Sequence, residues 1–181
     1  MQKERSNRLR KILRVCNFQE IEQKIQKTKD HKKAVKASTI QRILKCCPNF
    51  VGCFAEDELH NLRIQSFPCF LIVNIDSSSQ DGSHWIALGL FADRFEIMDP
   101  LGFTIFNWTR VPCNLMNFCH RFGSRRKILV AKRVQPDYSV LCGYYCIHYI
   151  IFRQLFSLQK VQSFFSRDLN KNDVKLINSF T

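Results

Sequence analysis

Short runs of branched and aromatic residues recur along the chain, each bounded by Asp, Ser, Gly or Pro. They occupy residues 67–75, 85–91, 95–98 and 127–134. Branched and aromatic side chains favour β-strands, whereas the bounding residues favour turns. We therefore predict four strands, which would form one sheet.

Two further segments have the longer apolar pattern that is typical of helices. The pattern predicts a helix over 114–122, between the third and fourth strands, and a strongly apolar helix over 142–156. Upstream, Ser38 or Thr39 can cap a short helix that Pro48 ends.

The N-terminal region differs from the rest of the chain in charge. Residues 1–37 hold 12 Lys and Arg against four Asp and Glu, so they supply +8 of the total charge of +13. We divide the chain into a basic extension, 1–37, and a domain, 38–181.

Within the extension, loosely helical spacing over 9–29 indicates a partly amphipathic helix. A basic extension can bind nucleic acid by displacing counterions from phosphates, or it can be a solvated tail without a partner. Both interpretations stay open.

Length and composition limit the class of protein. A chain of 181 residues with 45% hydrophobic residues and 16 Phe has the material for one packed domain. Its apolar runs, such as 70–73 and 147–151, are far shorter than the ~20 residues that span a membrane. The N-terminus lacks the apolar segment of a signal peptide. We expect a cytosolic or nuclear protein with no membrane association and no secretion.

Nine cysteines are an odd number, and in a reducing compartment each is expected to be a free thiol. Cys46, Cys47 and Cys53 lie close together, but they contain no C-x-x-C pair. A zinc-binding module is therefore disfavoured, and we expect no metal site.

Cys142 is a candidate nucleophile because of its position. It lies where the loop 136–141 meets the apolar helix, and a helix N-terminus favours a negatively charged sulfur. The following Gly143 lets a substrate approach the backbone. The alternative is a buried core cysteine at the start of a helix.

His84 and Asp99 are candidates for the base and for the group that orients it. His84 precedes the strand at 85–91, and Asp99 follows the strand at 95–98. If these strands pair as a hairpin through residues 92–94, both side chains lie at the same end of it. Alternatively, His84 is structural and Asp99 only forms a turn before Pro100.

These residues also resemble a known family. The pairs His84-Trp85 and Cys142-Gly143, the turn 99–102 (Asp-Pro-Leu-Gly) and Gln135 resemble the adenovirus protease (adenain) family of cysteine proteases, with its relatives in large DNA viruses and virus-like transposons. Gln135 lies seven residues before Cys142, as in that family, whereas ubiquitin-like-protein proteases usually show six. Adenovirus enzymes have glutamate at the acid position, so Asp99 departs from them. The similarity extends over roughly residues 38–155.

The resemblance implies an α+β fold, with a mixed, mostly antiparallel sheet and the catalytic helix packed against it. It implies that Cys142, His84 and Asp99 form a triad and that Gln135 donates to the oxyanion. Trp85 and Gly143 would line the substrate groove, although Trp85 could equally pack in the core. No cofactor would be required, and DNA or a peptide could act as activator.

The resemblance also implies a role for the protein. The substrates would be viral precursor or capsid proteins, cut at sites that contain glycine, in the host nucleus or the virion, by a monomer. Two alternatives stay open: a deubiquitinase-like or deSUMOylase-like protease that uses the same triad, and a basic DNA-binding protein built on an inactive protease domain.

Overall fold

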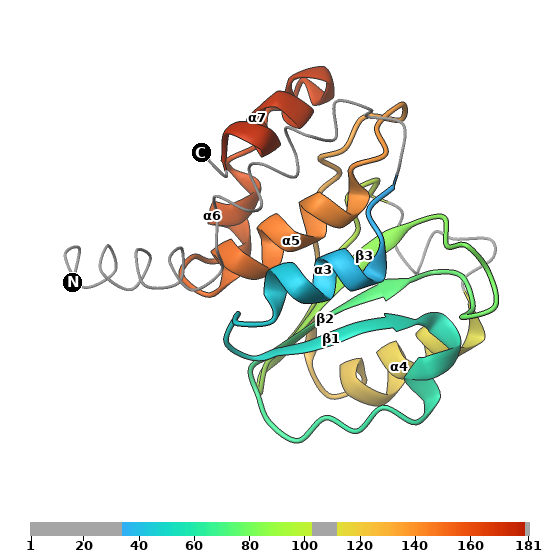
Figure 1. The fold of residues 1–181 in the computed structure, drawn as a ribbon. Helices are drawn as coiled ribbons and strands as arrows, with labels where there is room; N and C mark the ends of the chain where they lie inside the picture. The colour runs from blue at the N-terminus through green and yellow to red at the C-terminus, as the bar shows by residue number, and fades with distance from the viewer. Residues whose placement is uncertain (1–33, 103–111, 180–181) are drawn as a thin grey trace.

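A five-stranded mixed sheet forms the centre of the molecule, in the order β1-β2-β3-β4-β5 (Figure 1). The computed structural model describes residues 34–102 and 112–179. The central pairs, β2 with β3 and β3 with β4, are antiparallel, and the outer pairs, β1 with β2 and β4 with β5, are parallel. The strands are β1 (Phe50–Ala55), β2 (Cys69–Asn74), β3 (Trp85–Leu90), β4 (Arg94–Met98) and β5 (Lys127–Val130).

Helices cover both faces of this sheet. On one face α3 and α5 pack side by side against β1 and β3, and on the other α4 lies with the 3-10 helix η1 (Figure 1). The expected α+β class is confirmed. The helices are α3 (Ala37–Leu44), α4 (Cys113–Gly123), α5 (Cys142–Arg153), α6 (Leu158–Gln162) and α7 (Asn172–Asn178), with the 3-10 helices η1 (Glu56–His60) and η2 (Leu169–Lys171).

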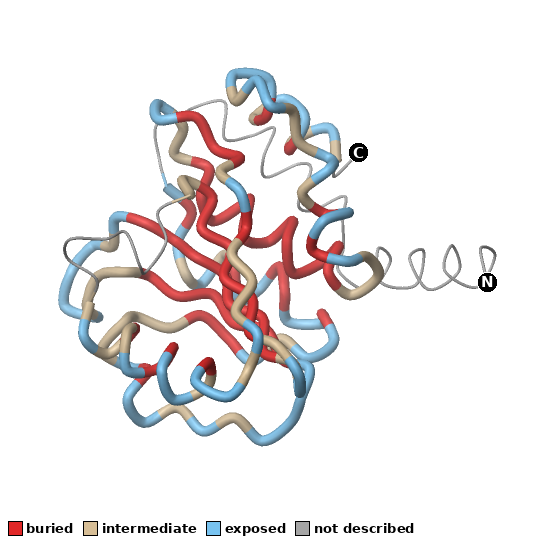
Figure 2. The backbone as a smooth tube through the Cα atoms, turned by 180° about the vertical axis from the view of Figure 1, so that it is seen from behind, coloured by how far each residue is buried: buried red, intermediate tan, exposed pale blue. Residues whose placement is uncertain are grey.

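Two hydrophobic cores follow from the two-residue period of the strands. In β2, Phe70 and Ile72 face the core under α5, whereas Leu71 and Val73 face the core under α4. All residues of β2 and β3 are buried, so the red trace of Figure 2 runs through the middle of the molecule. Strands that are covered on both faces read as continuous apolar runs, which is why the sequence pattern revealed them.

A buried ion pair holds α5 against the sheet. Arg153 donates from Nε and Nη2 to the two carboxylate oxygens of Glu96, each at 2.7 Å, and the Tyr149 hydroxyl donates to Glu96 at 2.8 Å. Burial alone would raise the pKa of Glu96, but the hydrogen bonds and charge of Arg153 outweigh it and hold that pKa below its usual value. Gly89 makes room for this contact, because a Cβ there would collide with the Tyr149 hydroxyl.

The predicted strands and helices are present, although the strand predicted over 127–134 ends at Val130 and the helix predicted over 142–156 ends at Arg153. Three further differences concern a cap, a strand and the C-terminal tail. The short helix begins at Ala37 after Lys36, and no side chain caps it, so the cap predicted at Ser38 or Thr39 is wrong. Strand β1 was not predicted as a strand, and the helices α6, η2 and α7 of the C-terminal tail were not predicted either. The helix predicted over 9–29 lies outside the described residues.

The described part of the chain contains no helix that combines the length and the apolar character of a membrane span. Within the same residues, no three His, Cys, Asp or Glu side chains group closely enough to hold a metal ion.

Candidate active site

The ends of two antiparallel strands bring His84 and Asp99 together. His84 directly precedes β3 and Asp99 directly follows β4, and the register of these strands places both at one end of the hairpin. The Nε2 atom of His84 lies 2.8 Å from Oδ1 of Asp99, and both side chains are buried. The backbone carbonyl of His84 also accepts from the Ile75 amide, which fixes the histidine to the end of β2. The contact expected from the hairpin is therefore present.

A tight turn after β4 aims the carboxylate of Asp99. Oδ1 accepts from the Leu101 amide at 2.9 Å as well as facing His84, and the Asp99 carbonyl accepts from the Gly102 amide. Gly102 has a φ of +73°, which favours glycine, and a Cβ there would lie 2.6 Å from Cβ of Arg133. The geometry of this turn thus explains why glycine ends the Asp-Pro-Leu-Gly sequence.

The same turn is joined to the segment that carries Gln135. The amides of Val134 and Gln135 both donate to the Pro100 carbonyl, at 3.0 and 2.9 Å. The Pro100 carbonyl therefore connects the turn that carries Asp99 with the segment that carries Gln135, although these two residues are 36 positions apart in the sequence.

The imidazole of His84 is held in its protonated form by its neighbours. Burial alone would lower its pKa, but hydrogen bonds and negative charge from Asp99 and Cys142 outweigh burial and raise the pKa to about 9. Since Nε2 faces Asp99, the other ring nitrogen is the one that can meet the Cys142 thiol. A protonated imidazole carries a proton on each ring nitrogen, so it can donate to Asp99 from one side and toward Cys142 from the other.

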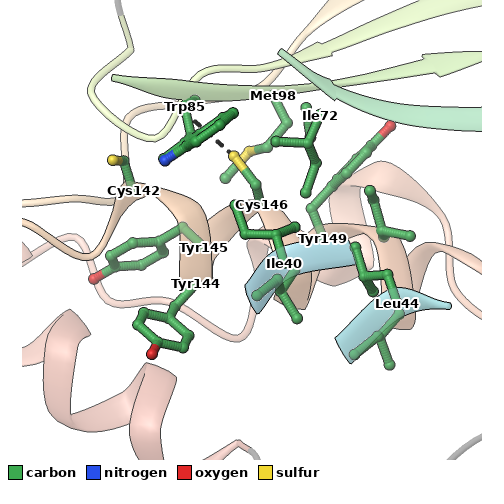
Figure 3. Close-up of a cluster of buried hydrophobic side chains, with 14 of the residues drawn as sticks. Ile40, Leu44, Ile72, Trp85, Met98, Cys142, Tyr144, Tyr145, Cys146 and Tyr149 are labelled. Carbon is green, nitrogen blue, oxygen red and sulfur yellow. Dashed lines mark hydrogen bonds between the residues drawn. The ribbon is translucent and has the colours of Figure 1, made fainter. Parts of the chain in front are cut away.

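Cys142 is the first residue of α5, so its amide is one of those at a helix start without a partner inside the helix. Figure 3 shows its sulfur at the open end of the helix, beside Trp85 of β3. The next cysteine, Cys146, lies one turn further into the core, and its thiol donates to the Trp85 carbonyl at 3.4 Å. Burial raises the pKa of Cys146 well above its usual value, which makes it a poor nucleophile.

Gln135 is buried, and its side-chain amide is already fixed. Nε2 donates to the Ser139 carbonyl at 2.6 Å, across the loop that leads to Cys142. An amide group has two N–H bonds, so one remains for another acceptor. The structure thus places an oriented donor in the loop before the nucleophile, and the oxyanion role of Gln135 stays a prediction.

Trp85 and Gly143, the residues expected to line the groove, both contact Val35. The indole of Trp85 donates to the Val35 carbonyl at 2.9 Å, and a Cβ on Gly143 would collide with Cγ1 of Val35. Trp85 also lines a cavity of about 460 Å³, whose walls include residues 34–37, 53–55, 77–78 and 80–82. Val35, counted in the extension by the sequence analysis, is buried in the core of the domain.

Sequence reasoning missed two contributors to this region besides Val35. Ser139 and Asp173 form hydrogen bonds that connect the loop before Cys142 with α7 and α5. The only feature of the sequence that pointed to these two residues was the position of Ser139 between Gln135 and Cys142. His148 of α5 is not part of the site: it stacks on Phe152, and burial lowers its pKa to about 3.

Comparisons with known proteins bear on the fold. No protein-family model and no curated protein matches the sequence. Ten chains of solved structures match, among them the selenomethionine crystal structure of the ASFV pS273R protease, with a TM-score of 0.52 and 17% sequence identity. The alignment covers 81% of this chain and 66% of that one, so the chain spans just under two thirds of that protease. The fold of this chain is therefore of the adenain and ubiquitin-like-protease type, as the sequence predicted.

Proposed function

We propose that this protein is a cysteine endopeptidase with Cys142 as nucleophile, His84 as general base and acid, and Asp99 as the group that orients the histidine. The observation that carries the proposal is the 2.8 Å contact between Nε2 of His84 and Oδ1 of Asp99, with Cys142 near enough to the same imidazole to contribute to its raised pKa. This order of carboxylate, imidazole and thiol is the arrangement that nucleophilic catalysis requires.

The mechanism follows from the position of each group. The Cys142 thiolate attacks the scissile carbonyl and forms a tetrahedral intermediate. The intermediate's oxyanion would accept from the free N–H of Gln135 and from the Cys142 amide at the start of α5. Protonated His84 gives its proton to the leaving amine, and water, deprotonated by His84, then hydrolyses the thioester.

Access to the thiol supports a substrate with small residues at the cleavage site. Cys142 is 4% exposed, and Val35 fills the space over Gly143. A bulky side chain next to the scissile bond would have to displace this segment. We therefore propose cleavage at sites that contain glycine. We further propose that the substrates are viral precursor or capsid proteins, which would place the activity in the host nucleus or the virion.

The proposal is tested by labelling the protein with an electrophile and mapping the modified cysteine. A peptide that ends in glycine and carries a C-terminal electrophile should modify Cys142 alone, and Cys142→Ala should abolish both labelling and peptide hydrolysis. Cys146→Ala is the matched control, since it removes a cysteine one turn away. Retained hydrolysis in Cys142→Ala would disprove the assignment. Faster labelling by ubiquitin or SUMO that carries the same electrophile would favour the deubiquitinase-like alternative.

Gln135 has its own test. Gln135→Ala should lower kcat by about 10²–10³-fold with little change in KM, because an oxyanion donor acts on the transition state. Gln135→Glu is a useful companion, since it keeps the size of the side chain but replaces the donor by a carboxylate. An effect confined to KM would make Gln135 a substrate contact instead.

A further inference from the structure

We propose that Asp173, on the C-terminal helix α7, is a positioning residue for the oxyanion site: through Ser139 it holds the loop that carries Gln135 at one end and Cys142 at the other. This inference rests on the proposed peptidase function.

Ser139 is the point at which both ends of the loop meet. Its carbonyl accepts from the side-chain amide of Gln135 at 2.6 Å, and its hydroxyl oxygen accepts from the Leu141 amide at 3.2 Å, directly before Cys142. The positions of both proposed oxyanion donors, the Gln135 amide and the Cys142 N–H, therefore depend on where Ser139 lies.

Asp173 fixes Ser139 from outside the loop. Its Oδ1 accepts from the Ser139 hydroxyl at 3.0 Å and from the Tyr145 hydroxyl at 2.9 Å. Because the serine proton points to the carboxylate, a lone pair of the serine oxygen is left for the Leu141 amide. Tyr145 lies in the first turn of α5, so one carboxylate oxygen connects the loop to the helix that carries the nucleophile.

The tyrosine remains a donor over the whole working range of pH. Burial, together with the nearby charge of Asp173, raises the pKa of Tyr145 far above its usual value. Hydrogen bonds from neutral hydroxyls to a carboxylate are among the stronger ones in proteins. The hydrogen bond between Tyr145 of α5 and Asp173 of α7 is therefore maintained over the pH range in which His84 titrates.

Packing alone does not hold the tip of the loop. A cavity of about 310 Å³ lies between the loop and α7, and its walls include Tyr138, Leu141, Asp173 and Val174. Tyr138 and Val174 are exposed at 68% and 60%. Where side chains do not fill the space between two segments, the hydrogen bonds across it set their relative position.

A second contact from α7 fixes the start of the same loop. Nδ2 of Asn172, which is completely buried, donates to the Val134 carbonyl at 2.8 Å, one residue before Gln135. Asn172 also makes two hydrogen bonds with the backbone of Ser166, so it stabilises the C-terminal tail as well. Asp173 is the better residue to test, since both of its contacts are with the loop and α5.

The test compares two reactions of Cys142 in the full chain, one that needs the oxyanion site and one that does not. Hydrolysis of a peptide forms an oxyanion, whereas alkylation by iodoacetamide displaces iodide and forms none. Asp173→Ala should lower kcat by about 10–10²-fold with KM unchanged, since a displacement of about 1 Å can have an effect of that size. The alkylation rate and its pH profile should stay as in the wild type.

Companion variants separate positioning from loss of structure. Asp173→Asn keeps an acceptor oxygen and should restore most of kcat. Ser139→Ala should resemble Asp173→Ala, and the double variant should be no slower than either, because the two residues act as one unit. Asp168→Asn is the matched control: within the described part of the chain its carboxylate contacts only Asn170 and Lys171 of the same tail, so kcat should not change.

The outcomes distinguish this inference from the proposed function. A wild-type protein that neither reacts with the glycine electrophile nor hydrolyses peptides would overturn the peptidase function. In that case the side-chain amide signals of Gln135 in ¹H–¹⁵N spectra still test the positioning role: they should shift in Asp173→Ala, and unshifted signals would overturn it. In an active enzyme, an unchanged kcat in Asp173→Ala, or an alkylation rate that falls in parallel with kcat, would overturn it too.

Discussion

At the scale of single residues, the site depends on one buried histidine whose proton is held by two neighbours. In the sequence, His84, Asp99, Gln135 and Cys142 follow one another in the order and spacing of a known family. The positions of His84 and Asp99 at strand ends, and of Cys142 at a helix start, also made them candidates. The carboxylate contact was predictable because a hairpin register fixes which residues share an end. The contact with Val35 was not, since it joins residues 50 positions apart through close packing rather than through a pattern.

The raised pKa of His84 predicts a dependence of stability on pH. The folded protein binds this proton with a pKa of about 9, against 6.5 without its neighbours. The stabilisation, about 3 kcal/mol, is therefore complete below pH 6.5 and is lost as the pH rises through about 9. Activity that depends on the protonated imidazole should decline over the alkaline part of the same range.

Asp99→Asn tests this prediction because it removes the charge but keeps the size of the side chain. Urea unfolding between pH 6 and pH 10 should show the alkaline loss of stability in the wild type and a flatter curve in the variant. In parallel, the alkaline limb of kcat/KM should move to lower pH in the variant. Superimposable curves for the two proteins would show that Asp99 does not hold the proton.

At the scale of elements, the sequence predicted those segments whose own pattern matches their structure. Strands β2 and β3 and helix α5 are apolar over almost their whole length because they are covered by other elements. Strand β1 (FVGCFA) is also apolar, but Gly52 interrupts its branched and aromatic residues, and its register with β2 shifts between Phe50 and Gly52. Helix α7 has only Asn172 and Leu176 buried, and tertiary hydrogen bonds rather than an amphipathic pattern hold it in place.

The docking of residues 34–36 on the start of α5 gives a prediction at this scale. Gly143→Ala would drive a Cβ into Cγ1 of Val35, so the variant should lose about 1–3 kcal/mol of unfolding free energy through overpacking. Val35→Ala loses burial by itself but removes the clashing atoms. The double variant should therefore be more stable than the sum of the two single effects predicts, by about 1 kcal/mol or more.

Urea unfolding of the four proteins of this cycle measures the coupling. Val73→Ala is the matched control, because Val73 faces the core on the opposite side of the sheet. Combined with Gly143→Ala it should give additive effects. Additivity in the Val35 cycle would mean that residues 34–36 do not occupy the start of α5 in solution.

At the scale of the whole molecule, the positive charge is divided between the extension and the domain. The domain has basic residues on both sides of β5, at 125–127 and 132–133. In the structure Arg126 donates to the Phe91 and Phe122 carbonyls, and Arg133 donates to Gln135 and Asp137. Their guanidinium groups are used to hold loops together. The exposed remainder consists of Arg125, Lys127 and Lys132.

The extension is therefore the stronger candidate for binding nucleic acid, and its removal is the last prediction. Residues 1–33 hold 11 Lys and Arg against four Asp and Glu, and they end before Val35, which the domain needs. Deleting 1–33, rather than 1–37, should weaken binding to a random DNA duplex while peptide hydrolysis by Cys142 persists. The slope of log affinity against log salt changes by about 0.9 for each phosphate that the protein no longer neutralises, so it should become flatter by several units.

A full-length variant with the Lys and Arg of 1–33 replaced by Gln is the control for this deletion, because it removes the charge and keeps the length of the chain. It should match the deletion in affinity and in salt slope. If the deletion weakens binding but the Gln variant does not, the extension contacts DNA by means other than charge. If both proteins keep the slope of the wild type, the extension touches no phosphates, and exposed basic residues of the domain, such as Arg125, Lys127 and Lys132, carry whatever binding is measured.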